Sequence, residues 1–192
     1  MLFPILEATR GVLHTMKEGW WEFWSIPWLW RVVVAFMVVN AATTAGIQVI
    51  GVRVALGHPG VGASGWGIAL SLQAVGAVVG ASVVKRSRPG LGVCVLSAAA
   101  MALPMLALGL GWGVVAICTC FCMAGVGITV FDVSWESMVQ EKVPQAVYGR
   151  VISVAMAASL MSVPLGAGLA GSLLGSISDF LALLSLSLAV VI

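Results

Sequence analysis

Charged side chains are scarce in this sequence. Only 8% of its 192 residues are Asp, Glu, Lys or Arg, whereas soluble domains carry about 25%. A water-soluble chain of this length could not cover its surface with so few charges. With 61% hydrophobic residues, the composition indicates an all-α integral membrane protein, because a helix satisfies its own backbone hydrogen bonds inside a bilayer. The nine basic residues form no stripe on a polar helix, which argues against a nucleic-acid partner.

Residues typical of catalytic and metal sites are also few. The chain has two histidines and one tyrosine, and its sequence shows no Ser–His–Asp or His/Glu arrangement. We therefore expect no enzyme activity, no catalytic residues, no cofactor and no metal site. Three of the four cysteines stand in "CTCFC" (118–122), but no histidine or acidic residue is near them. We interpret them as small buried apolar residues rather than metal ligands.

Long apolar runs fill most of the chain. A bilayer core about 30 Å thick requires about 20 apolar residues per helix, and the sequence contains six candidate spans. They are residues 30–55, 65–84, 91–110, 112–135, 150–175 and 179–192. The sixth segment is too short for a full crossing, so we expect that it is truncated at the C-terminus.

The first 29 residues differ from the spans that follow. In residues 5–24, apolar and aromatic side chains recur at helical spacing among charged ones, and five tryptophans lie between positions 20 and 30. Tryptophan favours the membrane interface, where its ring and its N–H group are both satisfied. We therefore predict an amphipathic interfacial helix that ends at Pro27. The predicted organisation is a cytoplasmic linker helix at 1–29 and a six-span bundle at 30–192.

The basic residues are distributed unevenly over the predicted loops. If the N-terminus is cytoplasmic and the six spans alternate, only Arg53 lies on the outer side. The other eight lie on the cytoplasmic side: Arg10, Lys17, Arg31, Lys85, Arg86, Arg88, Lys142 and Arg150. This imbalance follows the positive-inside rule and predicts a multi-pass protein with a cytoplasmic N-terminus.

Polar side chains inside the spans are the candidates for a solute path. Asn40, Thr44 and Gln48 follow one another at intervals of four residues and so share a helix face, and Gln73 lies in the second span. Polar groups at membrane depth usually face the protein interior or a water-filled cavity. The open alternative is that Asn40 and Gln48 only form hydrogen bonds between helices.

Two acidic residues lie near the cytoplasmic end of the fourth span. Asp132 and Glu136 are four residues apart and share a face. They either pair with cytoplasmic Arg or Lys side chains as a gate latch or carry protons, and their nearness to the membrane surface favours the latch. Pro104 and Pro164 lie inside spans, where proline permits bending.

Small residues at four-residue spacing suggest close helix packing. Gly76 and Gly80 form one such pair, and Gly171 and Gly175 form another. If the chain functions by pairing, the face of Gly76 and Gly80 is the expected contact surface.

The stretch "EKVPQAVYGRV" (141–151) is a polar island between two apolar runs. It is predicted to be a cytoplasmic loop between the fourth and fifth spans. Pro144 would stop the fourth helix, Gly149 would allow a turn, and Arg150 would anchor the fifth span at the headgroups.

This loop resembles a segment of bacterial exporters of the major facilitator superfamily. The family pattern of Gln, Pro, Gly/Ala, Arg and Val is matched by Gln140, Pro144, Gly149, Arg150 and Val151. "KEGWWEFWSIPWLW" (17–30) resembles the entry to the second half of such exporters, and "PLGAGLAG" (164–171) resembles their fifth span. The resemblance covers almost the whole chain and points to the drug-exporter-like branch that includes macrolide and siderophore exporters.

The family's basic loop motif is similar to "GASVVKRSRPG" (80–90), in which Lys85, Arg86 and Arg88 fit. Val84 stands at the position of the acidic residue and Ser87 at that of the second glycine, so this copy departs from a charge-relay role. The three basic residues are retained as gating or loop candidates.

The resemblance implies the C-terminal six-helix half of a proton-coupled antiporter in a bacterial-type cell membrane. Such a transporter would export lipophilic small molecules or antibiotics, with the solute site between two six-span bundles. The expected partners are the lipid bilayer, a lipophilic solute and a missing N-terminal half. The alternatives are a half-size protein that pairs with itself or with a partner half, and an inactive transporter remnant.

Overall fold

The computed structural model describes residues 21, 24–58, 60–85, 90–173 and 178–191, and these segments contain helices and no strand. Five helical stretches are long and apolar enough to cross a membrane: Pro27–Gly57, Gly62–Val84, Leu91–Gly109, Val114–Lys142 and Val147–Ser172. They confirm the first five predicted spans. The sixth predicted span is a shorter apolar helix, Leu181–Val190. The protein is thus a small all-helical multi-pass membrane protein that contacts the lipid bilayer.

The first span consists of three consecutive helical segments. It begins with α2 (Pro27–Thr43), continues as the π-helix η1 (Thr44–Gly51) and ends with α3 (Val52–Gly57). Ile26 is extended before Pro27, which occupies the first turn of α2, where its missing N–H is not needed. This confirms the predicted break at Pro27. Most of the predicted interfacial helix at 5–24 lies outside the described residues, and the division at residues 29 and 30 stays a prediction.

The third span is interrupted at Met101 and Ala102, which form a turn between α5 (Leu91–Ala100) and α6 (Leu103–Gly109). Pro104 lies in the first turn of α6. Because proline has no N–H group, it cannot continue the hydrogen-bond ladder of α5. Pro164 differs, since it lies inside the continuous helix α8 (Gln145–Leu173).

Three glycines bring α4 (Gly62–Val84) close to α7 (Val114–Lys142). A Cβ atom at Gly76 would collide with the carbonyl group of Cys122, and one at Gly80 would lie 2.9 Å from the Val126 oxygen. From the other side, a Cβ at Gly125 would collide with the backbone of Gln73. The glycines therefore form a contact face, as predicted.

The predicted use of that face is wrong in one respect. Gly76 and Gly80 are buried against α7 of the same chain, so they offer no surface for pairing with another chain. The spacing revealed a contact face but not its partner. A Cβ atom at Gly171 would meet none of the described residues within 4 Å, and Gly175 lies outside the described residues.

The polar island is mostly helical rather than a loop. α7 ends at Lys142 and α8 begins at Gln145, so Val143 and Pro144 alone connect them. Val143 is extended, because a residue before proline avoids the helical conformation. The predicted turn at Gly149 is wrong, because Gly149 lies within α8.

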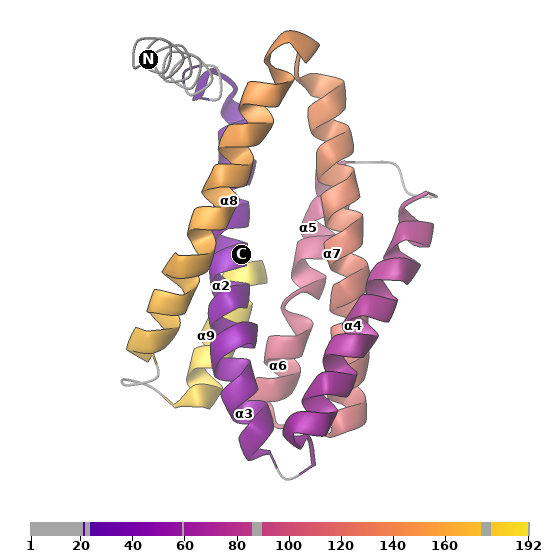
Figure 1. Cartoon of the computed structure of the whole chain (residues 1–192), viewed down its shortest axis with the longest axis vertical. Coiled ribbons are helices and arrows are strands. Elements are labelled where there is room, and N and C mark those ends of the chain that lie inside the picture. Colours follow the sequence, from indigo (N-terminus) through magenta and orange to yellow (C-terminus); the bar gives the residue numbers. More distant parts are fainter. Residues whose placement is uncertain (1–20, 22–23, 59, 86–89, 174–177, 192) are drawn as a thin grey trace, which may run out of the picture.

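The helices form two groups, and α7 and α8, one from each group, diverge from the connection between them, as Figure 1 shows. α7 packs against α4, α5 and α6, whereas α8 packs against α2 and η1. The last helix, α9 (Asp179–Val191), contacts α6, α2 and η1. Because α7 and α8 touch each other only sparsely, cavities remain between the two groups.

Opposite ends of the bundle carry the connections that the alternating topology predicts. Arg53 and Asp179 both belong to the predicted outer side, and they form an ion pair of 3.6 Å. At the other end, Lys142 lies 5.4 Å from the ring centre of Trp28. We refer to this end as the predicted cytoplasmic end.

Candidate functional site

A polar cavity of about 370 Å³ lies between the two groups of helices. Its polar lining comes from four elements: Asn40 and Thr43 of α2, Thr44 and Gln48 of η1, Gln73 of α4 and Asp132 of α7. The structure thus brings together all four solute-path candidates, Asn40, Thr44, Gln48 and Gln73. Asp132, predicted for gating, lines the same space. We call this space the polar cavity.

The π-helix η1 forms one wall of the polar cavity. A π-helix has wider turns than an α-helix, and such segments are frequent at functional sites. Thr44 and Gln48 both line the cavity, although Thr44 is only 6% exposed and Gln48 is exposed. The four-residue spacing therefore identified the cavity-lining residues even though it was interpreted as α-helical.

Close packing against α6 holds η1 in place. Gly46 is buried so tightly that a Cβ atom would collide with the Met105 side chain, and one at Gly51 would stand 3.2 Å from Leu108. The start of η1 is preceded by Thr43, whose hydroxyl group donates to the carbonyl oxygens of Val39 at 2.5 Å and Asn40 at 3.2 Å. Such back-bonding satisfies the hydroxyl within its own helix.

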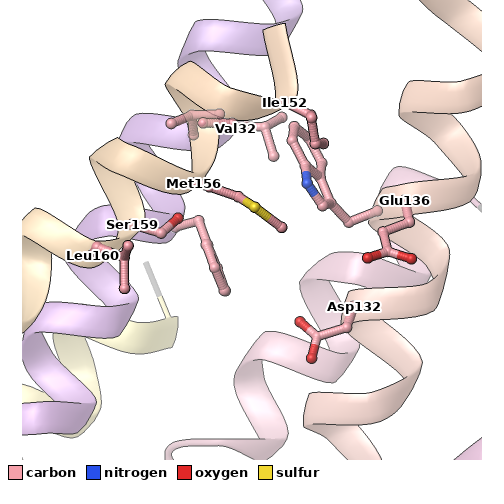
Figure 2. Close-up of a pocket in the computed structure, with 11 residues that line it drawn as sticks. Val32, Asp132, Glu136, Ile152, Met156, Ser159 and Leu160 are labelled. Atoms are coloured by element: carbon pink, nitrogen blue, oxygen red, sulfur yellow. The ribbon is translucent and has the colours of Figure 1, made fainter. Parts of the chain in front are cut away.

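An acidic cavity of about 400 Å³ adjoins the polar cavity. Figure 2 shows Asp132 and Glu136 projecting from α7 toward a space whose other side is formed by Met156 and Ser159 of α8. Asp132 and Phe36 line both cavities. Asp132 therefore lies where the two cavities meet, and both have partly apolar linings.

The predicted latch between the acidic residues and cytoplasmic basic residues stays a prediction. Within the described residues, neither Asp132 nor Glu136 forms an ion pair with Arg or Lys. Lys85 is exposed at the end of α4, and Arg150 is half-buried in α8 with an interaction partner. Arg86 and Arg88 lie outside the described residues.

A separate apolar cluster lies at the predicted cytoplasmic end of the site. We call it the end cluster, and its buried members are Leu29, Val33, Val139, Val143, Val151 and Ala155. Trp28 and Trp135 pack against this cluster, and their ring centres are 6.3 Å apart. The cluster ties the start of α2 to the end of α7 and the start of α8.

Sequence reasoning missed the aromatic wall of the site. Phe36 of α2 stacks on Phe131 of α7, with ring centres 4.5 Å apart and planes 13° apart. Phe36 borders both cavities. A phenylalanine in a span carries no sequence signal that separates a cavity wall from a lipid-facing position.

The cysteines lie apart from these cavities. Cys94, Cys118 and Cys120 are buried and Cys122 is half-buried, all as free thiols. Their burial agrees with the interpretation as small apolar residues. No cluster of three or more His, Cys, Asp or Glu side chains suited to a metal ion occurs in the described part of the chain.

No family model, no curated protein and no solved structure matches the chain at a significant level.

Proposed function

We propose that the chain is one helical bundle of a membrane transporter and that its solute path runs through the polar and acidic cavities. The observation that supports this is the convergence of Asn40, Gln48, Gln73 and Asp132, from three spans, on one cavity. Polar groups at membrane depth are costly unless they serve an interior path or a site. A purely structural anchor has no need of a shared polar cavity.

The dimensions and lining of the cavities suit a lipophilic small molecule. Their volumes, about 370 and 400 Å³, lie within the range of about 300–1,000 Å³ that is usual for ligand sites. Amides supply directional hydrogen bonds, while Phe36, Trp135 and Met156 supply apolar contact area. A solute with a large apolar body and a few polar groups matches this combination.

The direction of transport and the coupling ion in this proposal come from the resemblance to major facilitator exporters. It favours proton-coupled efflux of compounds such as antibiotics, performed together with a second six-span bundle. Alternating access would then expose the cavities first to one side and then to the other. The proposal assigns the chain no enzyme activity and no cofactor.

The two acidic residues have separate positions within this scheme. Asp132 borders the polar cavity, whereas Glu136 lines only the acidic cavity. In the favoured scheme they hold the cytoplasmic gate through basic side chains. Proton carriage is the alternative role.

Efflux of a lipophilic dye from intact cells tests the proposal. The full chain is expressed alone and together with a six-span N-terminal bundle of an exporter of this class. We expect efflux when both are present, and we expect Gln73→Leu to lower it about fivefold through loss of a hydrogen bond. Insertion should not change, because leucine is accepted at membrane depth.

Ser71→Ala provides a matched control on the same helix. The Ser71 hydroxyl is exposed and donates to the Gly67 carbonyl oxygen at 2.9 Å, away from the polar cavity. Its removal should leave efflux unchanged. The proposal is overturned if co-expressing cells at equal protein level show no more efflux than cells without the chain.

A further inference from the structure

A third cavity, of about 600 Å³, lies between α2, α5 and α9 and opens on the surface of the bundle that faces the lipid. We call it the apolar slot. Its walls include Ala35 and Val38 of α2 and Val95 and Ala98 of α5, and among the described residues of its lining only Arg31 is charged. Phe36 and Phe131, which stack on each other, also line the slot. Phe36 therefore borders both the slot and the polar cavity.

The slot is accessible from the bilayer. Val38, Leu91 and Val95 on its rim are 49%, 50% and 65% exposed. Since the chain spans the membrane, an apolar crevice at this depth meets hydrocarbon rather than water. The slot follows α2 from Arg31 to Val39, which corresponds to about 12 Å of helix axis. One leaflet of the hydrocarbon core is about 15 Å thick, so an acyl chain fits this length.

The end of the slot at Arg31 has the chemistry of a headgroup site. Arg31 is exposed, and its guanidinium carbon lies 5.5 Å from the ring centre of Trp30. Trp30 pairs in turn with Trp24, with ring centres 5.3 Å apart. Tryptophan and arginine together mark the level of the membrane interface. A guanidinium group binds phosphate oxygens through two parallel hydrogen bonds.

We propose that the apolar slot binds an anionic phospholipid, with one acyl chain between α2 and α5 and its phosphate at Arg31. The charge of Arg31 favours an anionic headgroup over a zwitterionic one, because the other described residues of the lining are uncharged. The predicted cytoplasmic position of Arg31 agrees with this choice, since anionic lipids attract basic residues at that surface.

Photocrosslinking in vesicles tests the site. The photoreactive residue p-benzoylphenylalanine is placed at Val95 in the slot or, as a control, at Met123 of α7, which is far from Lys142, the basic residue in the last turn of that helix. Both positions are exposed, at 65% and 51%. The full chain is reconstituted in vesicles of equal parts phosphatidylglycerol and phosphatidylcholine. Mass spectrometry then gives the ratio of the two lipids among the adducts.

We expect the ratio of phosphatidylglycerol to phosphatidylcholine adducts to be about fivefold higher at Val95 than at Met123, the effect of one basic residue near an anionic lipid. Arg31→Gln should remove this enrichment. Arg53→Gln, which removes a charge at the opposite end, should leave it unchanged. Equal ratios at the two positions, or enrichment that persists in Arg31→Gln, would overturn the proposal.

Filling the slot provides a second, independent variant. Ala35→Leu narrows the slot, whereas Ala74→Leu adds the same bulk on the exposed face of α4. The enrichment at Val95 should fall in the first variant and persist in the second. If crosslinked dimers are the main product at Val95, a second copy of the chain occupies the slot and the lipid proposal is wrong.

Discussion

Gly76 of α4 lies directly against the carbonyl group of Cys122 of α7, and there is no room between them for a methyl group. The helices α4 and α7 thus approach each other backbone to backbone. Gly125, about one turn along α7, repeats the arrangement in the opposite direction against Gln73. This reciprocal packing fixes the position of Gln73, whose side chain lines the polar cavity.

Gly76→Ala is expected to destabilise the protein by about 1–3 kcal/mol, the usual cost of overpacking. The added methyl group would push α4 away from α7, and the backbone of Cys122 cannot move aside as a flexible side chain could. Thermal unfolding in detergent, followed by tryptophan fluorescence, measures the effect. The interpretation fails if the variant melts at the same temperature as the unmodified chain.

Gly149→Ala, unlike Gly76→Ala, is expected not to destabilise the protein. Gly149 lies inside α8, and a Cβ atom there would meet nothing within 4 Å. Alanine favours a helix over glycine by about 0.5–1 kcal/mol. The melting temperature should therefore stay the same or rise. A clear decrease would show that Gly149 serves a turn, as its sequence context first suggested.

Arg150→Ala is expected to lower efflux without preventing insertion. Arg150 is half-buried near the start of α8 and has an interaction partner, so its loss should loosen the helix where α7 and α8 meet. The measurement is dye efflux at equal protein level in the membrane fraction. Normal efflux in this variant would contradict the anchoring role.

Asp132→Asn tests whether Asp132 acts in a gate latch or carries a proton. In the favoured latch scheme, the variant lowers efflux but leaves it responsive to an imposed pH gradient. If Asp132 carried the proton, the response to the gradient would disappear. Flux in vesicles with and without the gradient distinguishes these outcomes. Glu141→Gln, which neutralises an exposed acid at the end of α7, is the control.

The spans were predictable because bilayer thickness sets a minimum length for an apolar helix. The break before Pro104 and the start at Pro27 also follow from a single property, the missing N–H group of proline. By contrast, Gly149 could not be assigned from its sequence alone. Glycine allows a turn and is also tolerated in a helix. In the structure the helix break falls at Val143 and Pro144, and Gly149 lies inside α8.

Most of the candidate site was predictable for a related reason. Polar side chains in an apolar segment avoid lipid, so Asn40, Thr44, Gln48 and Gln73 were expected to face inward, and they line one cavity. The π-helical form of η1 was not expected. Within η1, Gly46 packs tightly against Met105, and a contact between distant segments leaves no periodic pattern in the sequence.

The meeting of α7 and α8 at the end cluster has a mechanical consequence. Each helix contains 29 residues and is therefore about 43 Å long. A change of 10° in the angle between them, made at the end cluster, would displace their far ends by about 7 Å. The packing of valine and alanine side chains at one end thus influences how far apart the opposite ends of α7 and α8 lie.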